Sequence, residues 1–291
     1  MDLAAVLTLD VLNGVASLIL LCTGLAVIFG MMKIINLAHG EFLMLGAYAT
    51  VVAVEAGINI WIAMLVVSPV FVGLVGLVVE RTFIRLLYGR LVDSMLATWG
   101  LSLIMQQTYR SIFGAREVGV ELPEWMMGAI QVTDLVELPI NGLFVMALTL
   151  VISGIVFLLM FRSSWGLQVR AVTQNRVMAG AAGINGRRVD AMTFALGCGI
   201  AGVAGSAFTM IGSTGPTSGQ LYIVDTFLVV VFGGAQSLLG TIASALTISQ
   251  SQSTLEFFLS GSMAKVFTLL VVVLILLVRP QGLFVLKVRK G

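Results

Sequence analysis

The sequence has few charged residues. Only 10% of its 291 residues are Asp, Glu, Lys or Arg, whereas 59% are hydrophobic. Soluble domains carry about 25% charged residues, so this deficit excludes an ordinary soluble protein. The apolar residues form long continuous runs and do not alternate with polar ones, which indicates membrane-spanning helices and not a transmembrane β-barrel.

Residues with catalytic or metal-binding chemistry are also scarce. The chain has one histidine, His39, and two cysteines, Cys22 and Cys198, which fall in apolar runs and are expected to be buried reduced thiols. A single histidine gives no metal site, and the sequence contains no Gly-x-x-x-x-Gly-Lys-Ser/Thr loop for ATP. A formal charge of +2 gives no support for nucleic-acid binding. We therefore expect no enzyme and no cofactor bound by this chain.

Eight apolar segments predict an all-α, polytopic membrane protein in which residues 1–291 form one transmembrane domain. The first segment is too long for the core of a signal peptide and has no basic region before it, so we expect it to be retained. The predicted helices are Val11 to Met32, Glu41 to Glu55, Trp61 to Val79, Ser94 to Phe113, Asn141 to Phe161, Val189 to Ile211, Thr226 to Ser249, and Lys265 to Val278.

The charges of the connecting loops predict the orientation, because cytoplasmic loops of membrane proteins are enriched in Lys and Arg. Basic residues follow the third segment (Arg81, Arg85, Arg90), follow the fifth (Arg162, Arg170, Arg176, Arg187, Arg188) and end the chain (Arg279, Lys287, Arg289, Lys290). The loop between the fourth and fifth segments is acidic instead, with Glu117, Glu121, Glu124, Asp134 and Glu137. The basic regions, including the C-terminus, should be cytoplasmic, and the acidic loop should face outside.

Eight single crossings conflict with this orientation, since they would leave the C-terminus outside. One segment must therefore enter the membrane and return. The stretch "VVVFGGAQSLLGTIASALT" is the candidate, because Gly233 and Gly234 break a helix and Gln236 lies in the break. Broken helices at membrane depth are tolerated where they are buried in protein or line a cavity, and they mark binding sites in many transporters.

The stretch "INLAHGEFLMLGAYA" is the predicted counterpart in the first half, and it contains Asn36, His39, Gly40 and Glu41. Glu41 is expected in the first turn of a helix, where the helix dipole favours a carboxylate. The group forms either a capped, solvated helix start at the cytoplasmic interface or a set of polar residues lining a path through the membrane. Gln106, on the fourth segment, should likewise bond a neighbouring helix or face that path.

The connection from Phe161 to Asp190 predicts an amphipathic helix, "LQVRAVTQNRVMAGAAGI", that Gly183 ends. A basic amphipathic helix can lie on anionic lipid or dock a soluble partner. Small residues such as Ala179 and Gly180 allow close approach and favour docking.

Four motifs together resemble the permeases of bacterial ABC importers for branched-chain amino acids, urea and short amides: "GMMKIINLAHGEFLMLGAYAT", "GLQVRAVTQNRVMAGAAGI", "VVVFGGAQSLLGT" and "RPQGLF". The resemblance implies a subunit of the bacterial inner membrane, a second homologous permease, two cytoplasmic ATPase subunits that bind ATP and Mg, and a periplasmic solute-binding protein. It implies that residues 162–188 are the coupling segment gripped by an ATPase, with Arg170, Ala171, Arg176, Ala179, Gly180, Gly183 and Ile184. The broken segments from Asn36 to Glu41 and from Gly233 to Gln236 would line the route.

Within that family, "LATWGLSLIMQQ", "FGAREVGV" and "AKVFTLLVVVLILLVRPQGLF" resemble the urea and short-amide arm more closely. Urea is neutral and suits amide and carboxylate partners. An amino acid would want separated charge partners, and Lys33 is the one cation expected at depth. Import of urea or short amides is thus the main expectation, with branched-chain amino acid import and a passive small-solute channel as alternatives.

Overall fold

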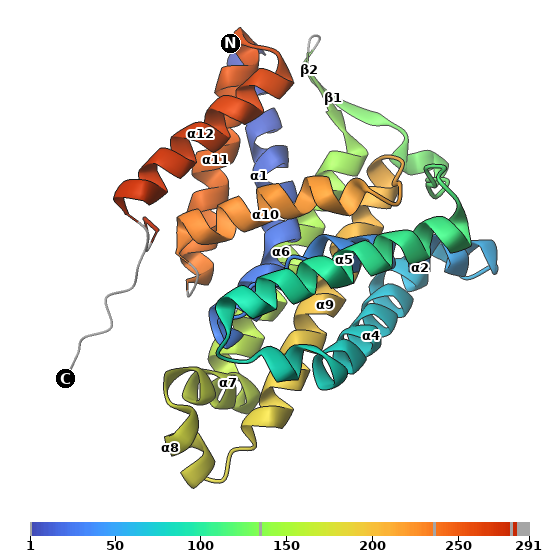
Figure 1. Ribbon diagram of the computed structural model, residues 1–291. Helices are drawn as coiled ribbons and strands as arrows, with labels where there is room; N and C mark the ends of the chain where they lie inside the picture. Colours follow the sequence, from blue (N-terminus) through green and yellow to red (C-terminus); the bar gives the residue numbers. More distant parts are fainter. Residues whose placement is uncertain (1, 134–135, 235–236, 280–281, 284–291) are drawn as a thin grey trace.

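A computed structural model of the chain describes residues 2–133, 136–234, 237–279 and 282–283 (Figure 1). The helices are α1 Asp2–Met32, α2 His39–Glu55, α3 Ile60–Ile62, α4 Ser68–Thr82, α5 Leu91–Phe113, α6 Ile140–Arg162, α7 Ser164–Gln174, α8 Arg176–Ala181, α9 Gly186–Ile211, α10 Ser218–Gly233, α11 Leu238–Phe258 and α12 Gly261–Val278. Shorter helical turns are η1 Ala63–Val67, η2 Ile84–Leu87 and η3 Glu124–Met126.

Five stretches of these helices are long and apolar enough to cross a membrane: Thr8–Met32, Ile60–Thr82, Ile140–Arg162, Gly186–Ile211 and Gly261–Val278. The helical, polytopic class is therefore confirmed. The count of eight segments is not, because α2 and α10 have only 17 and 16 residues. Two further helices, α5 and α11, are long enough but do not meet the same combined test of length and apolar character.

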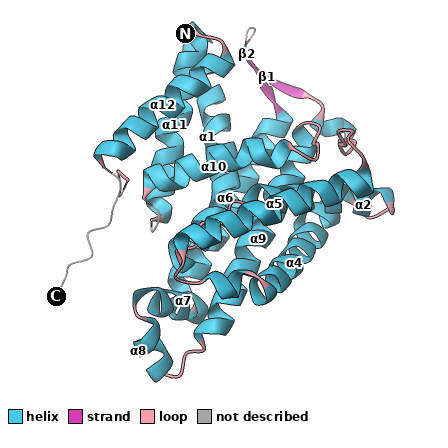
Figure 2. Cartoon of the chain, viewed as in Figure 1, coloured by secondary structure: helices cyan, strands magenta, loops and turns pink. Residues whose placement is uncertain are grey.

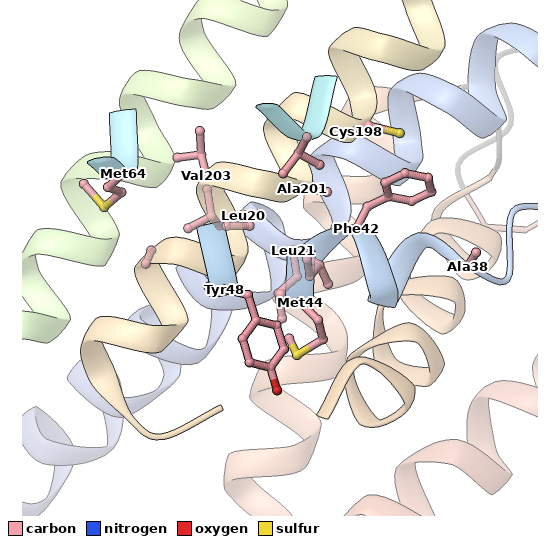
Figure 3. Packing of buried hydrophobic residues seen from close by; sticks show 14 of the residues in the cluster. Leu20, Leu21, Ala38, Phe42, Met44, Tyr48, Met64, Cys198, Ala201 and Val203 are labelled. Carbon is pink, nitrogen blue, oxygen red and sulfur yellow. The ribbon is translucent and has the colours of Figure 1, made fainter. Parts of the chain in front are cut away.

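Helix α9 lies at the centre of the molecule, with α1, α2 and α4 packed around it (Figure 1). Buried side chains of α1, α2 and α9 meet in the main hydrophobic cluster, which includes Leu20, Phe42, Tyr48 and Ala201 (Figure 3). Glycines allow α2 and α9 to approach closely: a Cβ added at Gly205 would overlap the Leu43 carbonyl oxygen. This close contact fixes the position of α2.

Buried hydroxyl groups reinforce the contact between α2, α4 and α9. Thr50 donates to Ser206 Oγ at 2.7 Å, and Ser206 donates to Ser68 Oγ at 2.8 Å. Because no water competes in an apolar interior, such interhelical hydrogen bonds add modestly to the packing of membrane helices.

We predict that Gly205→Ala destabilises the fold by about 1–3 kcal/mol, because the added methyl group overpacks the contact with the Leu43 carbonyl. Gly154→Ala on α6 is the matched control, since a Cβ there meets nothing within 4 Å and alanine favours a helix. Thermal unfolding in detergent, followed by the reactivity of the buried thiols of Cys22 and Cys198, measures both. Equal midpoints for the two variants would contradict the close packing of α2 on α9.

The two ends of the molecule differ. Helices α7 and α8 lie at one end, and the strands β1 Ala129–Thr133 and β2 Val136–Pro139 form an antiparallel hairpin at the opposite end (Figures 1 and 2). The hairpin was not predicted, so the all-α class needs this small correction. Its strands fall within the acidic loop, and the basic α7–α8 connection lies at the far end, as the loop charges predict.

The seventh predicted helix, Thr226 to Ser249, is wrong in its bounds. The structure has two helices there: α10 begins eight residues earlier, at Ser218, and α11 continues to Phe258. The chain breaks at Gly234, whose φ is +92°, and the Ser237 side chain accepts the Gly240 N–H at 2.9 Å to cap α11. The early start of α10 was missed because Gly219, Gln220 and Asp225 resemble loop residues, whereas tertiary packing holds them in a helix.

Candidate functional site

The connection from Lys33 to Ala38 runs back into the protein. Helix α1 ends at Met32, yet a Cβ added at Gly24, two turns earlier, would lie 3.1 Å from the His39 ring. Asn36, His39 and Glu41 are at most 1% exposed. The alternative of a solvated helix start at the cytoplasmic interface is therefore wrong, because apolar helices cover the start of α2.

The carboxylate of Glu41 is held by α5. One of its oxygens, Oε1, accepts hydrogen bonds from Gln106 Nε2 at 2.8 Å and from Ser102 Oγ at 3.1 Å. Gln106 also donates to Ser102 Oγ at 3.1 Å. Glu41 and Gln106, both candidate residues predicted from the sequence, thus meet directly. Of the two alternatives expected for Gln106, the structure shows the hydrogen bond to a neighbouring helix.

Two further residues of α5 bind the backbone of the same segment. Tyr109 donates its hydroxyl hydrogen to the Glu41 carbonyl at 2.9 Å, and Thr98 Oγ1 accepts the Leu37 N–H at 3.1 Å. Thr98, Ser102, Gln106 and Tyr109 are spaced by four, four and three residues, which places them on one helix face. Sequence reasoning missed this stripe, although its spacing within "TWGLSLIMQQTY" was the signal that could have revealed it.

Several polar atoms near this stripe stay without hydrogen-bond partners in the described part of the chain: Asn36 Nδ2, Glu41 Oε2 and Tyr48 Oη. The imidazole of His39 faces the Leu21 carbonyl, but neither ring nitrogen meets hydrogen-bond geometry with it. Unsatisfied polar atoms are rare in protein interiors and usually have a specific cause. The start of α2 therefore has spare capacity for hydrogen bonds.

Helix α10 begins against the start of α2. A Cβ added at Gly40 would overlap the Gly219 carbonyl oxygen, and one added at Gly219 would lie 2.7 Å from the Gly40 oxygen. The second break lies at the other end of α10, which ends at Gly233 and is followed by Gly234. At 1.5 Å per residue the two breaks are about 20 Å apart along α10, so the structure does not bring them together.

The second break is a tight helix-to-helix turn. The backbones of Gly233 and Gly240 meet there, because a Cβ added to either glycine would overlap the carbonyl of the other. Gln236, the remaining candidate of this group, lies outside the described residues.

The predicted amphipathic helix of the Phe161 to Asp190 connection is two helices. Asn175 leaves helical geometry between α7 and α8, and its side chain caps α8 by accepting the Met178 N–H at 3.0 Å. Ala179 is buried, Gly180 and Gly183 are exposed, and Gly183 has a φ of +82° that suits its place after α8. Ala171 and Ile184 are half-buried and pack against a small hydrophobic cluster of Val169, Val172, Ala179 and Val189.

The two arginines named for this segment face the protein. Arg170 donates to the Met160 carbonyl and lies over the Phe161 ring, 5.5 Å from its centre. The exposed side chains of α7 and α8 include the apolar Leu167, Val177 and Met178, which are 61%, 81% and 68% exposed.

Arg176 joins three elements. It forms an ion pair with Asp190 of α9, and its guanidinium lies 5.3 Å from the centre of the Tyr88 ring, in the turn before α5. Tyr88 in turn donates to Glu80 Oε1 of α4 at 2.5 Å. Burial and this hydrogen bond raise the pKa of Tyr88, so the phenol remains protonated and continues to donate. The connection thereby contacts Tyr88, three residues before α5, the helix whose Ser102 and Gln106 bind the Glu41 carboxylate.

Comparison with known protein families decides the class of this protein. Residues 7–276 match the family described as branched-chain amino acid transport system / permease component. The chain belongs to this permease family. The match covers nearly all of the described helices, so the permease is a multi-pass membrane protein, and the family that it matches consists of transport subunits.

Curated relatives of the permease span almost its whole length. It is 28% identical to the high-affinity branched-chain amino acid transport system permease protein LivH of Escherichia coli and 27% identical to that of Salmonella typhimurium, over 91% of this chain and 90% of each relative. It is 26% identical to the permease protein BraD of Pseudomonas aeruginosa, over the same shares. No solved structure gives a significant match.

These relatives favour the branched-chain amino acid alternative over the urea and short-amide expectation. The finer resemblance to the urea arm finds no support among them.

Proposed function

We propose that this permease is a membrane subunit of an ATP-driven importer for branched-chain amino acids. The family match over residues 7–276 carries the proposal, and relatives of nearly equal length that are described as branched-chain amino acid permeases support it. The passive-channel alternative is less well supported, because a channel needs no cytoplasmic docking segment such as α7 and α8.

The importer would contain a second homologous permease, two ATPase subunits that bind ATP and Mg, and a periplasmic binding protein that delivers the solute. In this assembly the α7–α8 end and the C-terminus face the cytoplasm, and the β1–β2 end faces the periplasm. The opposite charges of the two ends support this orientation.

Residues 162–188 act as the coupling segment of a single transmembrane permease domain. The exposed Val177 and Met178 of α8 touch the ATPase, whereas Arg170 and Arg176 fix the segment to the membrane helices. The unsatisfied polar atoms at Asn36, His39 and Glu41 support a role for the start of α2 on the route or at its gate.

We predict that Met178→Asp weakens ATPase binding, because a carboxylate replaces an exposed apolar contact on α8. Met127→Asp is the matched control: Met127 is 66% exposed, against 68% for Met178, but lies near the hairpin at the opposite end. Copurification of the ATPase subunits should fall about tenfold or more for Met178→Asp, as loss of one interface hot spot of ~1.4 kcal/mol or more does. Equal ATPase recovery with both variants would contradict docking at α8.

The substrate class is tested in cells. A bacterial strain that lacks branched-chain amino acid uptake, supplied with this permease and its partner subunits, should regain growth on limiting leucine. Restored urea uptake without restored growth on leucine would favour the urea importer instead.

A further inference from the structure

Three cavities follow one another along α12 in the described part of the chain. Their volumes are about 230, 590 and 440 Å³. The first two share Ile248 and Thr268, and the last two share Val271 and Ile275. Together they form a groove from Lys265, in the second turn of α12, to the end of this helix.

The 230 Å³ cavity contains an ion pair between two otherwise apolar helices. Lys265 Nζ of α12 lies 2.7 Å from Asp225 Oδ2 of α10, and the two side chains are 45% and 28% exposed. Charged groups within membrane helices are expensive and usually face a partner or a water-filled cavity. The pair therefore marks the place in the groove where charge is tolerated.

The rest of this cavity is mostly aliphatic. Leu18 of α1, Leu228 of α10, Ile248 of α11 and Leu269 of α12 line it, and the Gln252 amide and the Thr268 hydroxyl add two neutral polar groups. A cavity of 230 Å³ is somewhat smaller than the roughly 300–1,000 Å³ of drug-sized sites, which suits a single small molecule.

We propose that this cavity binds a small aliphatic α-amino acid, with Asp225 taking the ammonium group, Lys265 the carboxylate, and the aliphatic walls the side chain. This site would be a binding site for the solute of the proposed importer, so the choice of an amino acid as its ligand rests on the proposed function. The structure also adds a second cation to Lys33 among the apolar segments, because Lys265 of the candidate span Gly261–Val278 lies beside an acidic partner.

Binding would exchange one ion pair for two. The ammonium and carboxylate of the ligand insert between Asp225 and Lys265, so each protein charge keeps an opposite partner throughout. The free energy needed to separate Asp225 from Lys265 offsets much of the free energy gained from the two ion pairs with the ligand, which keeps binding weak. Weak binding suits a transport route, because a solute must leave its site as readily as it enters.

The cavity lies toward the predicted periplasmic end. Lys265 is the fifth residue of α12, and α12 begins at the same end of the molecule as the β1–β2 hairpin (Figure 1). The larger cavity beside it carries Thr247, Gln250, Ser251 and Thr254 on its α11 face.

Protection of an introduced thiol tests the site directly. Val266 lines the cavity and is 57% exposed, whereas the native Cys22 and Cys198 are fully buried. In the assembled importer without ATP, Val266→Cys should react with a water-soluble methanethiosulfonate reagent. Leucine at about ten times its dissociation constant should slow this reaction about tenfold. A Met127→Cys importer, labelled outside the cavity, should show no protection.

The charge pair is tested by adding Asp225→Asn together with Lys265→Met to the Val266→Cys chain. This double change removes both charges without leaving one unpaired, and it should abolish protection while labelling continues. Absence of labelling, or labelling that leucine does not slow, in an importer that transports leucine would overturn the site and leave the proposed function standing. Protection that survives the double change would overturn the roles of the charges. Protection by urea and not by leucine would overturn both the site's ligand class and the proposed function.

Discussion

Glu41→Leu is expected to destabilise the permease by about 1–3 kcal/mol and to abolish leucine import. The substitution removes the acceptor of the Gln106 and Ser102 hydrogen bonds and leaves a buried amide without that partner. Thermal unfolding and ATP-driven uptake measure the two effects. Gln107→Leu, one position away on the exposed face of α5, is the matched control and should change neither.

Two companion variants identify the cause. Glu41→Gln keeps an oxygen acceptor of the same shape and should retain stability. Glu41→Leu combined with Gln106→Leu should recover much of the lost stability, because replacing both partners of a buried hydrogen bond by apolar groups is nearly neutral. If the double variant is as unstable as the sum of the two single changes, the contact between Glu41 and Gln106 does not hold α2 to α5.

Arg176→Gln should uncouple ATP hydrolysis from transport. The arginine links α8 to Asp190 of α9 and to the Tyr88 ring before α5, so its loss separates the coupling segment from the membrane helices. Coupling free energies of about 1–3 kcal/mol are typical, and we expect leucine imported per ATP hydrolysed to fall about fivefold or more. The ratio of uptake to ATPase rate in proteoliposomes measures it.

The control for this prediction is Arg187→Gln, since Arg187 is exposed on α9 and forms no ion pair among the described residues. Pairing Arg176→Gln with Asp190→Asn should restore stability, because no buried carboxylate is left alone, but should not restore coupling. An unchanged ratio of uptake to ATPase rate in Arg176→Gln would show that this arginine does not couple ATP hydrolysis to transport.

Helix positions could be predicted where apolar runs are long and bounded by charges. The predicted start and end of the first, fourth, fifth and sixth segments lie close to α1, α5, α6 and α9, except that α1 begins earlier, at Asp2. Prediction failed where tertiary contacts override composition. Gly219 is part of a helix because it packs on Gly40, and no local pattern reveals that contact.

The candidate site was predicted in its residue types but not in its environment. "NLAHGE" indicated a polar helix start, and Gln106 stood out on an apolar helix, yet their burial and direct contact depend on how α5 crosses α2. The ion pair of Asp225 and Lys265 joins residues 40 positions apart, and the predicted helices began at Thr226, one residue after Asp225, and at Lys265 itself.

The most direct test of the central claim is ATP-driven uptake by proteoliposomes that contain the permease, its partner permease, both ATPase subunits and the binding protein. Labelled leucine should accumulate only with ATP, excess unlabelled isoleucine or valine should compete, and urea should not. Accumulation of urea without leucine would contradict the branched-chain amino acid assignment, and entry of either solute at the same rate without ATP would contradict an ATP-driven importer.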